Sequence, residues 1–253
     1  MPRLKISLLF APLLVGLLIS PVWGQSLSSV LSRLDQNFYY PQKQGLKSLS
    51  VRVKWEQLDV ASGSGKFLRN PDFYFNWKMD GRLGRFELTE GNEHISKDRA
   101  QELIQQISQF SEPIIPLMLQ QKFSNFSGKI HEVAKNKLVV KLAQVSSDQD
   151  YKLLVDAQKW VIRKLRFKQS RSPENVEGEF SYIKIEGKPA ISESRSRFEV
   201  DGREYSEVTS FSYKKVKGIW WVHRIDQILK QDGHVLQTYV VKLSDFKPVL
   251  STP

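Results

Sequence analysis

The chain has 253 residues, contains no cysteine and carries a formal net charge of +11 at pH 7. The lack of cysteine excludes disulfides, thiolate metal sites, thiol catalysis and an N-terminal lipidated cysteine. The length suits one large all-β or α+β domain, or at most two small ones.

The N-terminus has the pattern of an export signal. A short positive segment, Met1–Lys5, precedes the apolar run Ile6–Ile19, and a site with small residues ends at Gly24. This pattern predicts a signal peptide over residues 1–24. The apolar run is too short to span a bilayer comfortably, which disfavours a membrane anchor. We therefore expect a periplasmic protein in which residues 25–253 form a single domain.

The positive charge is spread along the chain and does not gather in one tract. Export and this spread both argue against a nucleic-acid partner. Two interpretations stay open. The charge either forms a solvated basic face of a sheet, or it attracts anionic lipid headgroups or acidic cell-wall polymers.

The first predicted element is an amphipathic helix over Leu27–Tyr39, where apolar residues recur at helical spacing. Pro41 and Gly45 end it. Leu49–Leu58 alternates apolar and charged residues, as a half-buried strand does. Ala61–Gly65 is a flexible turn, since no Lys-Ser/Thr pair follows at the spacing of a phosphate-binding loop.

Three more strands are predicted over Lys66–Asn70, Phe73–Met79 and Leu83–Leu88. Asp80-Gly81 gives a tight turn between the last two. One face of the middle strand is strongly apolar and consists of Phe73, Phe75, Trp77 and Met79.

Lys97–Phe123 interrupts the strands with helical spacing, and Ser96 is placed to cap its start. Pro113 and Pro116 interrupt the helix, and Leu117–Phe123 is predicted as a second short helix. These helices either cover the open face of a curved sheet or form ordinary core.

The rest of the chain reads as hairpins. The most regular is Tyr151–Phe167, whose two strands are joined at Asp156–Lys159. Ser170–Glu177 is predicted as a mobile loop or a long crossover. The regular spacing favours an α+β, mainly β fold, in which a highly curved antiparallel sheet forms an unclosed β-barrel with helices covering its apolar concave face. The expected strands are Gly128–Ala134, Lys137–Gln144, Tyr151–Val155, Trp160–Phe167, Gly178–Gly187, Ile191–Val200, Tyr205–Val216, Ile219–Lys230 and His234–Phe246.

Aromatic side chains on the strand faces are the candidate ligand-binding residues. Either they form a normal sheet core beneath the helices, or part of their surface stays unfilled and accepts alkyl chains. Each buried methylene would then contribute roughly 0.8 kcal/mol. The candidates are Trp55, Phe73, Phe75, Trp77, Phe167, Phe180, Tyr182 and Phe211.

Catalytic and metal-binding signals are weak. No histidine lies at metal-ligand spacing from another, and no Gly-x-Ser-x-Gly sequence occurs. Asp148 with Asp150, or Glu199 with Asp201, would be carboxylate pairs, but acidic residues near turns are common. We expect no enzyme activity, no metal site and no cofactor. The histidines are His94, His131, His223 and His234.

The order of elements is a helix, a strand meander, a helical insert and a second meander. With the Leu154–Leu165 hairpin and the Phe67–Trp77 segment, it resembles the LolA/LolB-like superfamily of lipoprotein carriers. The resemblance implies an unclosed barrel with a helical lid over a cavity that holds acyl chains. The chain is longer than the founding carriers, and Glu174–Tyr213 looks like an extension, so the cargo is not specified.

The expected function is an exported periplasmic carrier or binder of lipid or lipoprotein acyl chains, acting as a monomer in outer-membrane lipoprotein sorting or lipid transport. The alternative is a non-enzymatic periplasmic sensor or scaffold of the same fold that binds a membrane-protein partner.

Overall fold

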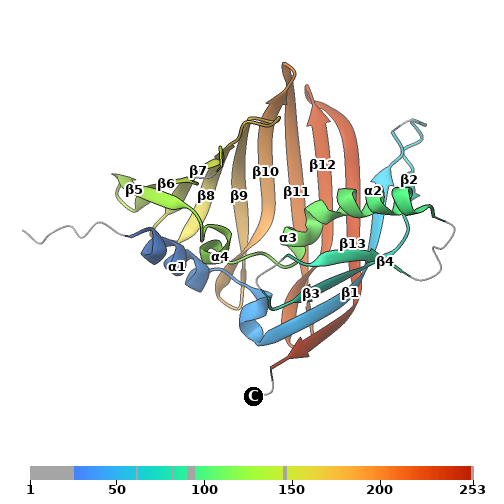
Figure 1. The fold of residues 1–253 in the computed structure, drawn as a ribbon, viewed down its shortest axis with the longest axis horizontal. Helices are drawn as coiled ribbons and strands as arrows, with labels where there is room; N and C mark the ends of the chain where they lie inside the picture. Colours follow the sequence, from blue (N-terminus) through green and yellow to red (C-terminus); the bar gives the residue numbers. More distant parts are fainter. Residues whose placement is uncertain (1–25, 61, 81–82, 90–94, 145–146, 252–253) are drawn as a thin grey trace, which may run out of the picture.

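A computed structural model describes residues 26–60, 62–80, 83–89, 95–144 and 147–251. The predicted signal peptide, His94 and part of the Asp80-Gly81 turn lie outside the described residues. Strands dominate and helices are few (Figure 1), which confirms the predicted mainly β fold.

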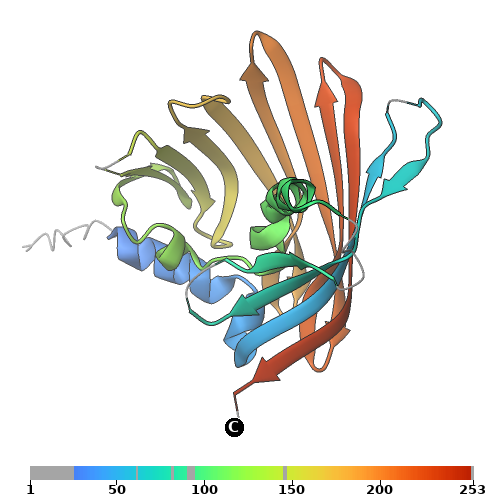
Figure 2. The ribbon, with the colours of Figure 1, turned by 45° about the vertical axis from the view of Figure 1, so that its right-hand side comes forward.

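The strands form one antiparallel thirteen-stranded sheet in the order β4-β3-β1-β13-β12-β11-β10-β9-β8-β7-β6-β5, with β2 paired to β1. Within the described residues the two ends of this order do not pair, so the sheet is curved and unclosed, as predicted (Figure 2). The strands are β1 (Leu46–Leu58), β2 (Phe67–Arg69), β3 (Phe73–Lys78), β4 (Arg85–Leu88), β5 (Ser127–Ala134), β6 (Lys137–Ala143), β7 (Asp150–Asp156), β8 (Val161–Lys168), β9 (Asn175–Ile185), β10 (Lys188–Val200), β11 (Arg203–Val216), β12 (Ile219–Gln231) and β13 (His234–Leu250).

The helices lie on the inner side of this curve (Figure 2). The hydroxyl of Ser26 accepts the Ser29 N–H at the start of the first helix. The hydroxyl of Ser96 accepts the Arg99 N–H, so the predicted cap is confirmed. The helical elements are α1 (Leu27–Asn37), η1 (Pro41–Gln44), α2 (Lys97–Ile107), η2 (Ser108–Phe110), α3 (Ser111–Ile114) and α4 (Leu119–Lys122).

Two main apolar clusters fill most of the concave side. One joins the segment from α2 to α3 to β1, β3, β4, β12 and β13, and it includes Trp55 and Trp221. The other joins α1 to β6, β7 and β8 and includes Leu34 and Val140. The space between these clusters is where the candidate site lies.

Two sequence predictions about β8–β11 are wrong. Ser170–Glu177 is no crossover, because β8 pairs directly with β9 and the Gln169 N–H donates to the Glu174 carbonyl across the short connection. Glu174–Tyr213 is no appended extension either. It forms β9, β10 and most of β11, which are interior strands of the sheet.

The β7–β8 hairpin turns where predicted, because the Asp156 carboxylate accepts the N–H groups of Gln158 and Lys159. Trp160 lies in this turn at φ 47° and does not start the strand. A register shift follows in the ladder, and both Val161 and Ile162 are buried. A bulge therefore interrupts the period of two at the start of β8, so both neighbours are buried there.

Candidate functional site

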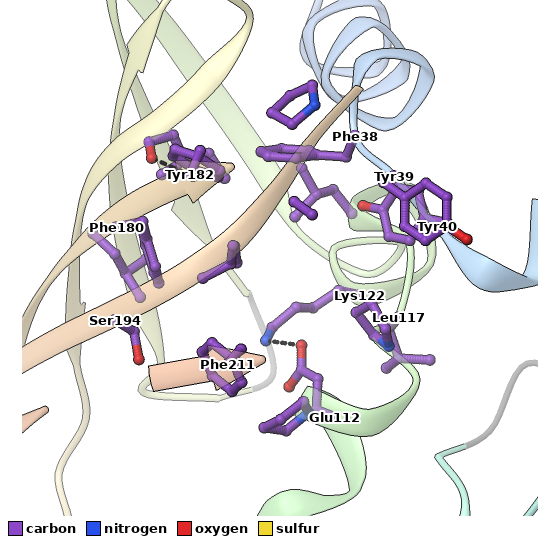
Figure 3. Close-up of a pocket in the computed structure, with 18 of the residues that line it drawn as sticks. Phe38, Tyr39, Tyr40, Glu112, Leu117, Lys122, Phe180, Tyr182, Ser194 and Phe211 are labelled. Carbon is purple, nitrogen blue, oxygen red and sulfur yellow. Dashed lines mark hydrogen bonds and ion pairs between the residues drawn. The ribbon is translucent and has the colours of Figure 1, made fainter. Parts of the chain in front are cut away.

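A cavity of about 360 Å³ lies between the inner face of β7–β11 and the chain that runs from α1 to η1 and from η2 to α4. Figure 3 shows aromatic side chains gathered around it from both sides. The volume is within the range of about 300–1,000 Å³ that is usual for small-molecule sites.

Three consecutive aromatic residues, Phe38, Tyr39 and Tyr40, form one wall. The chain leaves α1 at Phe38 in extended conformation, and Tyr40 is extended before Pro41. The Phe38 ring lies 5.6 Å from the Tyr182 ring of the sheet. The predicted helix over Leu27–Tyr39 is thus two residues too long at its end. Because it includes Phe38 and Tyr39, it does not identify them as part of a cavity wall. The aromatic run before a proline was the available signal.

On the sheet side, the tyrosine hydroxyls are bonded to the backbone. The Tyr182 hydroxyl donates to the Ile162 carbonyl at 2.6 Å, and the Tyr213 hydroxyl donates to the Ile191 carbonyl at 2.8 Å. Burial raises the pKa of both phenols. The polar tips are therefore satisfied by the protein, and the rings contribute carbon surface to the cavity.

The tyrosines after α1 are anchored similarly. The Tyr39 hydroxyl donates to the Trp220 carbonyl at 3.1 Å, and the Tyr40 hydroxyl donates to Asp35 Oδ1 at 2.7 Å. Burial raises the pKa of Tyr39 to about 12, and burial together with the neighbouring Asp35 raises the pKa of Tyr40. These phenols stay protonated at neutral pH, so they are poor candidates for proton transfer.

Asp35 positions this side of the site and was missed in the sequence. Its carboxylate is buried and accepts the N–H groups of Leu119 and Gln120 at 2.8 and 2.9 Å, as well as the Tyr40 hydroxyl. It therefore joins α1 to the first turn of α4. The available signal was its place one helical turn after Leu31, within the apolar stripe of the helix.

One ion pair lies at the cavity, between Glu112 Oε1 of α3 and Lys122 Nζ of α4 at 2.6 Å (Figure 3). Their side chains are 37% and 33% exposed, so the cavity reaches water at this side. Among the described lining residues, these two and the tyrosines are the titratable groups. No lining residue forms a nucleophile–base pair.

Of the eight aromatic candidates, Phe180, Tyr182 and Phe211 line the cavity. Phe167 lies one ring further out, 4.6 Å from the cavity-lining Tyr151. The structure brings the first three together, and their part in ligand binding stays a prediction. The other four are buried in the filled cluster beneath α2 and do not line the cavity, as the ordinary-core interpretation expected: Trp55, Phe73, Phe75 and Trp77.

The described part of the chain holds no group of His, Cys, Asp or Glu placed to hold a metal ion. Its helices include none long and apolar enough to cross a membrane. Neither of the carboxylate pairs considered in the sequence lines the cavity. What the site offers is a concave apolar surface that is open to water on one side.

No protein-family model and no curated protein match the sequence. Among solved structures, the chain is similar to a LolA superfamily protein from Nitrosomonas europaea, at 10% identity over 90% of this chain and 95% of that one, with a TM-score of 0.32.

A second match is a domain from Vibrio parahaemolyticus described as an outer membrane lipoprotein-sorting protein domain, at 7% identity over 87% of this chain and 90% of that one, with a TM-score of 0.31. MucB of Pseudomonas aeruginosa, solved with MucA, matches at 10% identity over 88% and 99%, with a TM-score of 0.20. Scores this low describe the course of the chain alone, and function has to be inferred from the cavity.

Proposed function

We propose that this protein is an exported, non-enzymatic binder or carrier of lipid acyl chains. The observation that supports the proposal is the cavity of about 360 Å³, which is lined mostly by aromatic and aliphatic side chains and in which the hydroxyls of Tyr39, Tyr40, Tyr182 and Tyr213 are already bonded within the protein. A ligand that hydrogen-bonds strongly would find few free partners there. The predicted signal peptide over residues 1–24 supports export to the periplasm.

The energetics favour an alkyl chain. About ten methylenes transferred from water into the cavity would contribute about 8 kcal/mol. That is enough for binding after part of it offsets the cost of association. The Glu112–Lys122 pair lies where the cavity meets water, so it is placed near the polar end of a bound lipid.

The alternative function is a sensor or scaffold for a membrane protein. It would use Glu174–Tyr213 as a region that the founding carriers lack. That region forms interior strands of the sheet, and Phe180 and Phe211 within it line the cavity. The region is therefore no separate appendage for a partner, and the cavity that it helps to line makes acyl-chain binding the function the geometry supports best.

The test is uptake of a fluorescent fatty acid by the purified protein, together with lipid extraction and native mass spectrometry. Ser194 of β10 lines the cavity, so Ser194→Phe fills part of it. We expect uptake to fall at least about tenfold, since a ring removes space for several methylenes. Ser212→Phe is the matched control, because Ser212 is exposed on β11 and does not line the cavity.

Equal loss in both variants, or no uptake and no extractable lipid in the unmodified protein, would contradict the proposal. A thermal unfolding curve for Ser194→Phe separates a filled cavity from a lost fold, because overpacking costs typically about 1–3 kcal/mol. Specific retention of a membrane protein by lipid-free protein would favour the sensor alternative instead.

A further inference from the structure

A second hollow, of about 450 Å³, lies at one end of β5–β8, and five of its lining residues are basic. The described lining contains five cationic side chains and one carboxylate, Asp150. The cationic ones are Lys129, Lys141, Lys152, Arg166 and Lys168. The apolar cavity does not use any of these charges.

The register of the sheet places four of these cations in one row. Lys129 lies opposite Lys141, Lys141 opposite Lys152, and Lys152 opposite Arg166. Neighbouring strands are about 4.8 Å apart, so like charges stand side by side across four strands. Such directly opposed like charges destabilise a sheet.

The row faces away from the apolar core. Val140 and Leu142, on either side of Lys141, belong to the cluster under α1. Side chains alternate along a strand, so Lys141 and its cross-strand neighbours lie on the outer face.

Little in the protein neutralises this row. Arg166 is paired with Glu177 at one end. Within the described residues, Lys129, Lys141 and Lys152 form no ion pair. Their repulsion is therefore relieved by something outside the chain, either mobile counterions or an anionic partner.

The geometry points to an anionic lipid surface as that partner: we propose that the outer face of β5–β8 docks the protein on a membrane through its lysine row. A row of cationic side chains across four strands is complementary in charge to a plane of anionic headgroups. Val133 lies on the same β5 strand, four residues along from Lys129, and is 58% exposed; an exposed apolar side chain on a basic strand suits the boundary between headgroups and acyl chains. The proposal goes beyond acyl-chain binding and does not depend on it.

The position also has a functional consequence. Tyr151 of β7 lines both the basic hollow and the apolar cavity, so the two lie next to each other at the same part of the sheet. Docking through the lysine row would hold the cavity next to the membrane without burying it, because the cavity opens on the concave side.

The experiment is co-sedimentation of the protein with vesicles of phosphatidylcholine alone or of phosphatidylcholine with phosphatidylglycerol. The variant is Lys129→Gln/Lys141→Gln/Lys152→Gln. A lysine near an anionic surface is worth about fivefold in partition, so we expect about a 100-fold loss on the anionic vesicles. The unmodified protein should bind neutral vesicles weakly, and its binding to anionic vesicles should fall with salt.

A matched control removes three exposed lysines far along the sheet order, in Lys66→Gln/Lys78→Gln/Lys97→Gln. It lowers the net charge equally, and we expect it to keep most of the binding. The row variant should unfold at the same or a higher temperature than the unmodified protein, because it relieves like-charge repulsion. Lys141→Gln alone should lower binding to the anionic vesicles about fivefold, and this single change tests the row with minimal change to the fold.

Three results would overturn the proposal. One is an equal loss in the control variant, which would mean that net charge alone attracts the protein. Another is equal binding to neutral and anionic vesicles. The third is saturable binding of inorganic phosphate or of heparin at the row with no binding to vesicles, which would identify a small-anion or polyanion site. Fatty-acid uptake should be unchanged in the row variant, so failure here and failure of the proposed function remain distinguishable.

Discussion

At the scale of single residues, the cavity depends on polar groups that form hydrogen bonds to other groups of the protein. Asp35 uses its carboxylate on two backbone N–H groups of α4 and on the Tyr40 hydroxyl. A negative charge at the start of a helix is also in a favourable position. The contact links segments that are about 80 residues apart in sequence, and no periodicity in either segment predicts it.

Removing this carboxylate tests its structural role. Asp35→Ala leaves the Leu119 and Gln120 N–H groups without their acceptor, and we expect a loss of about 2–4 kcal/mol in the free energy of unfolding, measured in urea. Asp35→Asn should lose less, because the amide oxygen still accepts. Gln36→Ala, on the exposed side of the same helix, is the control and should change stability by less than about 0.5 kcal/mol. An unchanged free energy of unfolding in Asp35→Ala would show that α4 is held by packing alone.

At the scale of elements, one carboxylate ties three strands together. Asp72 precedes β3 and forms ion pairs with Arg52 of β1 at 2.7 Å and Arg69 of β2 at 3.0 Å. Burial alone would raise the pKa of Asp72, but hydrogen bonds and charge from the two arginines outweigh it and hold the pKa below its usual value.

The sign of the pH effect follows from this shift. The folded protein binds the Asp72 proton less readily than the unfolded chain does. The stabilisation is therefore present above the pKa that an aspartate has in an unfolded chain, and it is lost as the pH falls through the lower pKa of the folded protein. We expect Asp72→Asn to cost about 2 kcal/mol at pH 7 and less near pH 3. Unfolding curves at the two pH values check this, and an equal cost at both would contradict the ion-pair account.

The hairpins give a second prediction at this scale. In the β10–β11 turn, Asp201 and Gly202 have φ of 52° and 73°, the left-handed conformation of a two-residue turn. No atom lies within 4 Å of a Cβ placed on Gly202, so Gly202→Ala meets only backbone strain. The expected loss is about 1–2 kcal/mol in the free energy of unfolding, with fatty-acid uptake unchanged. A variant as stable as the parent would show that the turn relaxes to another type.

These turns explain why the hairpins could be predicted. Asp201-Gly202, Lys217-Gly218 and Asp232-Gly233 each carry positive φ at both residues, and this short-range requirement is visible in the residue types. The aromatic alternation of β3 could also be predicted, because it is a local pattern with the period of two that a strand has. Bulges, as at the start of β8, depend on the fit of neighbouring strands and leave no local pattern.

At the scale of the whole molecule, the sequence predicted the curved, unclosed sheet but only part of the site. Phe180, Tyr182 and Phe211 were among the candidates, whereas Phe38 and Asp35 were not. Parity within a strand says which side chains face inward. It does not say which inward-facing side chains touch a helix and which face a void. Trp55 and Phe180 therefore looked alike in the sequence, yet one is in the filled core and the other lines the cavity.

The place of β1 has one more consequence. Its partner β13 is the last described strand of the chain, so this part of the sheet joins segments that are far apart in the sequence. Pairing over such separations is slow, because the entropy cost of closing a long loop comes before any stabilising contact forms. A nascent chain that has not yet released β13 cannot complete the sheet around β1.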